Sequence, residues 1–222
     1  MRTEPFLPAG PQVLRGHPVI AVIRASTIPN VYELCRALLD GGITAVEFTY
    51  GTPEVERHVR HAVEQMSEAM VIGAGAVLTE SQAEKAVAAG AQFLATPCLR
   101  PEVVAVANNA GIPTITGAMT PSEIQVAWEM GSAAVKVFPA RCVGPQYLSD
   151  VRGPMPEIPL MPSGGVGGED AASFLAHGAA ALFVGGSVVA ANAVAAGDWS
   201  TITRSSIDFT RSLSSAEGRS WA

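Results

Sequence analysis

A single lysine inside an apolar segment is the residue whose surroundings most clearly suggest chemistry. Lys136 lies between Val135 and Val137, and Phe138 and Pro139 follow it. An ammonium group is costly to bury unless it is paired, or loses its proton and takes part in a reaction. A lysine held in an apolar cavity can have a lowered pKa, and its neutral amine can attack a ketone to form a Schiff base. The alternative is a structural lysine whose head group reaches solvent at the end of a strand.

Two other charged residues, Glu47 and Arg24, occur in or directly after apolar segments. Schiff-base chemistry needs a carboxyl group that moves protons at each step, and Glu47 is the natural partner for Lys136. The planar guanidinium of Arg24 suits recognition of a substrate carboxylate. Structural alternatives remain open for both residues. Glu47 could form an ion pair with Lys136 or Arg24, and Arg24 could reach solvent at the rim of the fold.

Two glycine pairs late in the chain predict a phosphate site. Each pair follows a short apolar segment, and bare backbone N–H groups after the last two strands of a barrel commonly bind phosphate. One pair alone would be a weak signal, whereas two pairs at these places strengthen each other. The two segments are Ser163-Gly164-Gly165 and Gly185-Gly186-Ser187.

The histidines and cysteines do not suggest a metal or cofactor site. The histidines fall in predicted loops or helices, and the three cysteines are far apart without the spacing of metal ligands. An odd number of scattered cysteines is typical of a reduced, cytoplasmic protein. We therefore expect no metal, no cofactor and no histidine base. The residues considered are His17, His58, His61, His177, Cys35, Cys98 and Cys142.

Short apolar segments and segments with helical spacing alternate along the whole chain. Repeated strand–helix units predict a parallel sheet with right-handed crossovers. Eight units in 222 residues fit a closed (β/α)8 barrel, and a doubly wound open sheet is the alternative. The predicted strands are residues 19–24, 45–50, 70–77, 92–96, 113–116, 134–138, 160–162 and 181–184. The predicted helices are residues 28–39, 53–66, 81–89, 101–109, 121–130, 145–151, 169–177 and a last one within 200–216.

No linker or shift in composition divides the chain. We therefore expect residues 1–222 to form one α/β domain, a (β/α)8 TIM barrel. Residues 1–17 contain three prolines and no clear periodicity. This segment is predicted to be an N-terminal lead-in, with one helical turn that covers an end of the barrel.

The barrel prediction places the charged residues on a common surface. Side chains of a strand point alternately to the barrel interior and to the helices, and catalytic groups belong at the C-terminal ends of the strands. If Lys136 points inward, Val135 and Val137 face the helices. By the same alternation Glu47 and Thr49 point inward. Polar residues on the inner face of several strands indicate a site in the barrel.

Composition limits the classes of partner. The net charge of −6 argues against nucleic acid and against an anionic membrane surface. No apolar run approaches the roughly 18 residues of a membrane span, and the N-terminus lacks the apolar core of a signal peptide. Hydrophobic residues make up 48% of the chain and charged residues 15%. This composition fits a large core and an oligomer that covers further apolar surface.

The sequence also resembles a known enzyme family in a series of motifs. The family is that of the 2-keto-3-deoxy-6-phosphogluconate (KDPG) / 4-hydroxy-2-oxoglutarate (KHG) aldolases, and the match runs from about residue 18 to residue 190. The matching segments are Glu47-Phe48-Thr49, Ile72-Gly73-Ala74-Gly75, Ala95-Thr96-Pro97, Lys136-Val137-Phe138-Pro139-Ala140, Pro162-Ser163-Gly164-Gly165 and Gly185-Gly186-Ser187.

The resemblance implies a class I aldolase, a carbon–carbon lyase that uses no metal and is commonly a homotrimer. It implies that Lys136 forms the Schiff base and that Glu47 moves protons at the C4 hydroxyl and the carbinolamine. Pro97 would pack against the pyruvyl part of the substrate. The implied reaction cleaves a 2-keto-3-deoxy-6-phospho sugar acid into pyruvate and glyceraldehyde 3-phosphate. The further substrate-binding residues that it implies are Thr49, Phe138, Ser163, Gly164, Gly165, Gly185, Gly186 and Ser187.

Two positions depart from the family pattern. Many members have arginine where this chain has Gly51 and threonine where it has Ala76, and both positions are associated with the substrate carboxylate. Some relatives instead carry arginine after the first strand, as in Ile23-Arg24-Ala25, and this subgroup includes 2-keto-3-deoxy-6-phosphogalactonate (KDPGal) aldolases. The stretch at residues 143–147 resembles that subgroup as well. We therefore expect Arg24 to bind the carboxylate.

Two other functions remain open at this point. One is a phosphosugar isomerase or epimerase barrel in which Lys136 acts only as a charge. The other is a non-catalytic keto-acid-binding relative, in which Gly51 and Ala76 reflect lost chemistry. Within the aldolase interpretation, the sequence does not distinguish the gluconate substrate, the galactonate substrate and 4-hydroxy-2-oxoglutarate.

Overall fold

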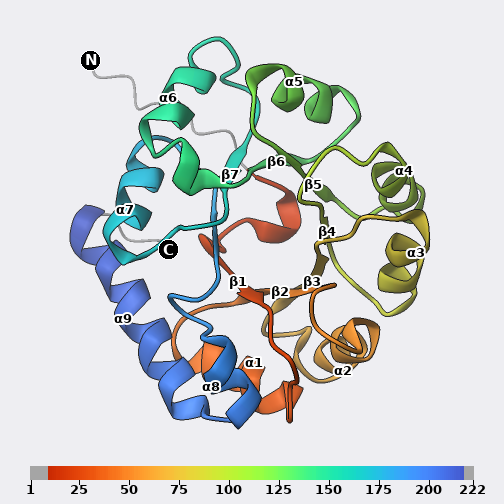
Figure 1. Cartoon of the computed structure of the whole chain (residues 1–222), viewed down its shortest axis with the longest axis vertical. Helices are drawn as coiled ribbons and strands as arrows, with labels where there is room; N and C mark the ends of the chain where they lie inside the picture. Colours follow the sequence, from red (N-terminus) through yellow and green to blue (C-terminus); the bar gives the residue numbers. More distant parts are fainter. Residues whose placement is uncertain (1–9, 218–222) are drawn as a thin grey trace.

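The computed structural model describes residues 10–217, in which eight parallel strands form a ring surrounded by helices (Figure 1). Each strand except the last is followed by one principal helix before the chain enters the next strand. The strands are β1 Val19–Ile23, β2 Ala45–Thr49, β3 Val71–Gly75, β4 Leu94–Ala95, β5 Thr114–Ala118, β6 Ala134–Val137, β7 Leu160–Pro162 and β8 Leu182–Val184.

The ring is a nearly closed (β/α)8 barrel. The strands are hydrogen-bonded in the order β7-β6-β5-β4-β3-β2-β1-β8. Between β7 and β8 the closure consists of an isolated parallel bridge from Ser163 to Phe183 and a hydrogen bond from Ala180 N–H to the Leu160 carbonyl oxygen at 2.8 Å. The predicted TIM barrel is thus confirmed, and the open doubly wound sheet is excluded.

The helices follow the predicted order, with local differences. Six strands are shorter than predicted. Four of them lose one residue, whereas predicted strand 92–96 is reduced to Leu94–Ala95 and 70–77 to Val71–Gly75. The sequence prediction missed α8, a six-residue helix too short to show helical periodicity. The helices are α1 Val31–Asp40, α2 Val55–Met66, α3 Glu80–Ala88, α4 Pro101–Ala110, α5 Pro121–Glu129, α6 Gln146–Arg152, α7 Gly168–Ala176, α8 Ala191–Ala196 and α9 Trp199–Glu217, with 3-10 turns η1 Gln12–Leu14 and η2 Ala140–Cys142.

Local sequence explains where several helices begin. Thr120 caps α5 and Thr79 caps α3, each in a reciprocal capping box with the residue three positions on. Pro121 occupies the first turn of α5, where its missing N–H costs no hydrogen bond. Each of these helix starts lies at the C-terminal end of the barrel, so the caps also define the loops around the site.

Apolar residues form two separate layers. The larger layer lies between strands and helices and contains Val46 and Phe48 of β2 and Val135 and Val137 of β6. The smaller layer fills the barrel interior. It consists of inward-pointing residues in or next to the strands, together with Leu14 of η1. Its members are Leu14, Ile20, Ala45, Val71, Phe93, Ala95, Ile115, Ala134, Met161, Ala181 and Phe183. The predicted alternation of β2 and β6 is confirmed.

The inner layer leaves one end of the barrel for polar groups. Leu14 of η1 is 4% exposed and packs with residues at the N-terminal ends of the strands, such as Ala45 and Ala134. This agrees with a lead-in that covers one barrel end; its residues 1–9 lie outside the described residues. No helix within residues 10–217 is long and apolar enough to cross a membrane.

Candidate active site

Lys136 and Glu47 form a buried pair inside the barrel. Lys136 Nζ donates a hydrogen bond to Glu47 Oε2 at 2.9 Å, and the two side chains are 7% and 1% exposed. They come from β6 and β2, which lie on opposite sides of the ring. Both side chains face a cavity of about 660 Å³ at the C-terminal ends of the strands. The pair brings an amine and a carboxyl group within contact distance, an arrangement chemically able to supply a nucleophile and a proton carrier.

An aromatic ring completes the surroundings of the lysine. Lys136 Nζ lies 4.3 Å from the centroid of the Phe183 ring, in the geometry of a cation–π contact. Phe183 belongs to β8 and also lines the cavity. The amine is therefore held from two sides, by a carboxylate and by a ring face. The apolar neighbours expected from the sequence are joined by Glu47, the expected partner, which reaches the lysine across the barrel.

Glycine at position 75 allows Glu47 to take this position. A Cβ on Gly75 would lie 2.0 Å from Cδ of Glu47. Gly75 pairs directly with Thr49 in the β2–β3 register, two positions beyond Glu47. Any side chain at position 75 would therefore displace the carboxylate from the lysine.

Arg24 lies at the cavity rim beside Gly51. A Cβ on Gly51 would lie 3.3 Å from Nε of Arg24 and 3.6 Å from its Cγ and Cδ. The arginine thus passes over the position where many family members have their own arginine. Arg24 lines the cavity and is exposed, so the structure brings it to the site as predicted.

Thr49 is the predicted site residue that does not line the cavity. Its hydroxyl donates to the carbonyl oxygen of Ile23 at 3.0 Å, and the residue is 1% exposed. The alternation of β2 turns its side chain inward, but the neighbouring strand takes up its only donor. Thr49 therefore links the C-terminal ends of β1 and β2, at the residue that precedes Arg24.

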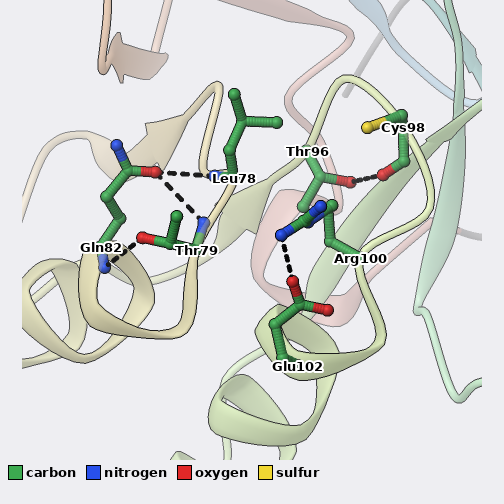
Figure 2. A network of polar contacts seen from close by, with 7 residues as sticks. All are labelled: Leu78, Thr79, Gln82, Thr96, Cys98, Arg100 and Glu102. Atoms are coloured by element: carbon green, nitrogen blue, oxygen red, sulfur yellow. Dashed lines mark hydrogen bonds and ion pairs between the residues drawn. The ribbon is translucent and has the colours of Figure 1, made fainter.

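Thr96 supports the loop that carries Pro97, through a hydrogen bond to Cys98 that Figure 2 shows and a second one to β5. Pro97 lines the cavity at the end of β4. The hydroxyl of Thr96 donates to the Cys98 carbonyl oxygen at 2.7 Å and accepts from Gly117 N–H at 3.0 Å. A Cβ on Gly117 would lie 2.2 Å from the carbonyl carbon of Pro97. The loop after β4 therefore packs directly on β5, which only glycine permits.

The neighbouring loop after β3 places Ala76 in an unusual conformation. Ala76 lines the cavity with a φ of 53°, in the left-handed region that side chains disfavour. Directly beyond it, Gln82 Oε1 accepts hydrogen bonds from Leu78 N–H at 2.8 Å and Thr79 N–H at 3.3 Å, as Figure 2 shows. The cap of α3 thus fixes the loop that carries the strained residue.

Both predicted glycine pairs line the open end of the cavity. Gly164 and Gly165 have φ values of 83° and 90°, and no atom lies within 4 Å of an added Cβ at Gly185 or Gly186. The Ser187 hydroxyl donates to the Val166 carbonyl oxygen at 3.3 Å, which links the two loops. Phe138 and Ser163 also line this part of the cavity. Exposed backbone at two adjacent loops is the arrangement that binds phosphate in barrels.

Several lining residues were missed by sequence reasoning. The most notable is Arg141 in η2, whose stem packs against Gly165. The signal that could have found it is its place just after the strand of Lys136, at the catalytic end of a barrel. The other missed residues are Val22, Val166, Gly167, Phe183, Val189 and Ala191. Within the described part of the chain, no group of three or more His, Cys, Asp or Glu residues could hold a metal ion.

Comparison with known proteins agrees with this geometry. A family model described as KDPG and KHG aldolase matches residues 11–205. The chain is 36% identical over 186 residues to 2-dehydro-3-deoxy-phosphogluconate aldolase of Treponema pallidum, which covers 83% of this chain and 88% of that protein.

Solved structures show the same relationship. A native KDPGal structure has a TM-score of 0.85 at 27% identity, covering 91% of this chain and 97% of the other. KDPG aldolase from Legionella pneumophila, with pyruvate captured as a covalent carbinolamine intermediate, has a TM-score of 0.81 at 30% identity, covering 88% and 95%. The chain therefore belongs to the KDPG and KHG aldolase family and is a class I aldolase, a carbon–carbon lyase.

Proposed function

We propose that this enzyme cleaves a 2-keto-3-deoxy-6-phospho sugar acid to pyruvate and glyceraldehyde 3-phosphate, with Lys136 as the Schiff-base lysine. The observation that carries the proposal is the buried contact of 2.9 Å between Lys136 Nζ and Glu47 Oε2. It lies at the base of a cavity whose open end is lined by glycine backbone. The other phosphosugar chemistries considered do not need a lysine paired in this way.

The first half of the reaction builds the Schiff base. Glu47 takes a proton from Lys136, and the neutral amine attacks the C2 ketone of the substrate to form a carbinolamine. Glu47 then returns the proton to the carbinolamine hydroxyl, which leaves as water. The product is a protonated imine that can accept the electrons of the adjacent carbon–carbon bond.

The second half breaks the substrate and restores the enzyme. The Glu47 carboxylate removes the proton of the C4 hydroxyl, the C3–C4 bond breaks, and its electrons move into the imine to form an enamine. The C4 fragment leaves as the aldehyde. Protonation at C3 and addition of one water then release pyruvate and the free lysine. The water consumed balances the one lost on imine formation.

The remaining lining residues are proposed to hold the two ends of the substrate. Arg24 binds the carboxylate in the space left by Gly51, while Pro97 and Phe138 form walls beside the pyruvyl part. Thr49 acts through the end of β1, where it bonds to the Ile23 carbonyl oxygen. The phosphate lies at the two glycine loops, with Ser163, Gly164, Gly165, Gly185, Gly186 and Ser187 as its surroundings.

Covalent trapping tests the central step. Incubation with pyruvate and borohydride should add a reduced pyruvyl group to the peptide that contains Lys136, as measured by mass spectrometry. Lys85 lies on α3 outside the cavity and serves as the internal control. A Lys136→Ala protein should fold with an unchanged circular dichroism spectrum and show no turnover. Label on Lys85 alone, or full activity of the variant, would contradict the Schiff-base role.

The choice of substrate requires a separate assay. Relatives named for both KDPG and KDPGal match this chain. Steady-state cleavage of the two epimers and of 4-hydroxy-2-oxoglutarate, with coupled detection of pyruvate, would rank the three substrates by kcat/KM.

We also propose that the enzyme acts in the cytoplasm as a homotrimer. The low content of charged residues, 15%, supports a buried interface, and the three cysteines are free. Light scattering coupled to size-exclusion chromatography should give a mass three times that of the chain. A monomer mass at micromolar concentration would contradict the trimer.

A further inference from the structure

The charges around the cavity are unevenly distributed. Among the described residues that line it, Arg24, Lys136 and Arg141 are basic and Glu47 alone is acidic. Lys136 is paired with Glu47, so the excess of positive charge comes from the two arginines. The chain as a whole has a net charge of −6, which makes the cavity a local basic region in an acidic protein. A cleft of this kind concentrates and orients anionic substrates.

Arg141 is built into the loop that carries one glycine pair. Its backbone N–H donates to the Gly164 carbonyl oxygen at 3.0 Å. A Cβ on Gly165 would lie 2.5 Å from Cβ of Arg141 and 3.1 Å from its Cγ and Cδ. The missing side chain at position 165 therefore lets the aliphatic stem of the arginine pass across the rim of the cavity.

The guanidinium of Arg141 has no acidic partner within residues 10–217. Arg36, Arg57, Arg100 and Lys136 form ion pairs there, whereas Arg141 does not. Arg141 is exposed at the cavity mouth, where exposed glycine backbone surrounds it. An arginine fork without a competing carboxylate suits bidentate contact with a phosphate dianion.

The loop that carries Arg141 is also anchored on its far side. Tyr147 of α6 donates a hydrogen bond to the carbonyl oxygen of Met119 in the loop after β5. Burial raises the pKa of Tyr147, so its hydroxyl stays neutral and keeps its proton for this bond. The arginine therefore projects from a supported turn, which lowers the entropy lost when it binds a ligand.

We propose that Arg141 determines specificity for the phosphorylated end of the substrate, by binding the phosphate together with the backbone at Gly164 and Gly165. The inference rests on the proposed function, because it assigns a residue to the phosphate site of that reaction. Arg24, which packs against Gly51 on a different loop, remains the carboxylate residue. The two arginines thus divide the two anionic ends of the substrate between them.

Paired substrates separate the two roles. Steady-state kinetics are measured with 2-keto-3-deoxy-6-phosphogluconate or its galactonate epimer, and with the same sugar acids lacking phosphate. Arg141→Gln should raise KM for the phosphorylated acids about 10- to 100-fold. It should leave kcat/KM for the unphosphorylated acids within about twofold. Arg24→Gln should raise KM for both kinds, since both carry the carboxylate.

Direct binding provides the second readout and the controls. Calorimetric titration with inorganic phosphate should show binding to the wild-type enzyme. Arg141→Gln should weaken this binding by a factor similar to its effect on KM, and Arg141→Lys should bind phosphate more tightly than Arg141→Gln. Arg204→Gln removes an exposed charge on α9 and should change neither measurement.

The outcomes distinguish the two levels of the proposal. Two results would show that the role of Arg141 is wrong while the aldolase proposal stands. In the first, the wild-type enzyme prefers phosphorylated acids and Arg141→Gln keeps that preference. In the second, Arg141→Gln lowers kcat/KM equally for phosphorylated and unphosphorylated acids. If pyruvate cannot be trapped on Lys136, the proposed function fails. In that case the calorimetric comparison alone tests whether Arg141 binds phosphate. If the wild-type enzyme binds no phosphate, the proposed role of Arg141 is wrong.

Discussion

At the scale of single residues, the site depends on contacts between side chains and the glycines that admit them. Glu47 reaches Lys136 because position 75 has no Cβ. Arg24 crosses the rim because position 51 has none. Gly51 departs from the family pattern, and Arg24, which directly follows β1, lies over that position instead. The two positions meet in the structure, although 27 positions separate them in the sequence.

This relationship predicts a rescue. Arg24→Ala should raise KM for the keto acid about 10- to 100-fold, because a charge-assisted contact to the carboxylate is lost. Adding Gly51→Arg to that variant should recover much of the loss, since the new side chain enters the space that Arg24 vacated. Gly51→Arg alone should weaken activity, because an added Cβ lies 3.3 Å from Nε of Arg24. Steady-state kinetics of the three variants check this, and a double variant no better than Arg24→Ala would contradict it.

At the scale of elements, two loops at the catalytic end are hydrogen-bonded to the next strand or its end. The loop after β4 is tied to β5 through Thr96 and Gly117. The loop after β3 is tied to β4, where Val77 N–H donates to the Ala95 carbonyl oxygen at 3.2 Å. Because these bonds join successive units, the position of Pro97 depends on β5 as well as on β4.

Gly117→Ala tests this dependence. The added Cβ would lie 2.2 Å from the Pro97 carbonyl carbon and 2.5 Å from Cys98 N, and backbone atoms cannot yield as a flexible side chain can. We expect the free energy of unfolding to fall by about 1–3 kcal/mol. We also expect kcat/KM to fall, because Pro97 moves.

Gly153→Ala is the matched control for that experiment. Position 153 has a helical φ of −52°, and the nearest atom to an added Cβ is 3.4 Å away. Chemical denaturation should show a change within about 0.5 kcal/mol. Equal stability of the two variants would show that the loop adjusts without cost.

At the scale of the whole molecule, two apolar layers divide the barrel into a closed core and an open end. The outer layer is continuous between strands and helices and includes the fully buried Cys35. The inner layer fills only the N-terminal part of the barrel, which leaves the C-terminal part for the site. The same packing separates the three cysteines, because Cys98 and Cys142 are exposed.

Thiol reactivity reports on this division. Burial raises the pKa of Cys35 to about 12, so its reactive thiolate is scarce at neutral pH as long as the fold is intact. A thiol reagent should modify Cys98 and Cys142 rapidly in the native enzyme and Cys35 only after unfolding in denaturant. Mass spectrometry of the labelled peptides identifies the sites. Rapid native labelling of Cys35 would show that the outer core opens near α1.

Much of this architecture could be predicted from the sequence, because its signals are local. The alternation of apolar and helical segments specified eight strand–helix units, and the two-residue period of β2 and β6 placed Glu47 and Lys136 on the inner face. The same alternation turned Thr49 inward but could not show that its hydroxyl bonds to the Ile23 carbonyl oxygen and that the residue does not line the cavity. The direction of a side chain follows from its own strand, whereas its hydrogen-bond partner depends on the strand beside it.

The sequence by itself determined the eight strand–helix units, the lysine, the carboxylate and the glycine loops, since the signal for each unit or residue lies within a short stretch of chain. Only the tertiary structure decided which of these groups meet. Lys136 and Glu47 are 89 positions apart and touch because closure of the ring sets β2 opposite β6. The places of Arg24 over Gly51 and Arg141 over Gly165 likewise arise from packing between loops of different units. Such contacts depend on the stagger and closure of the barrel, which no local pattern contains.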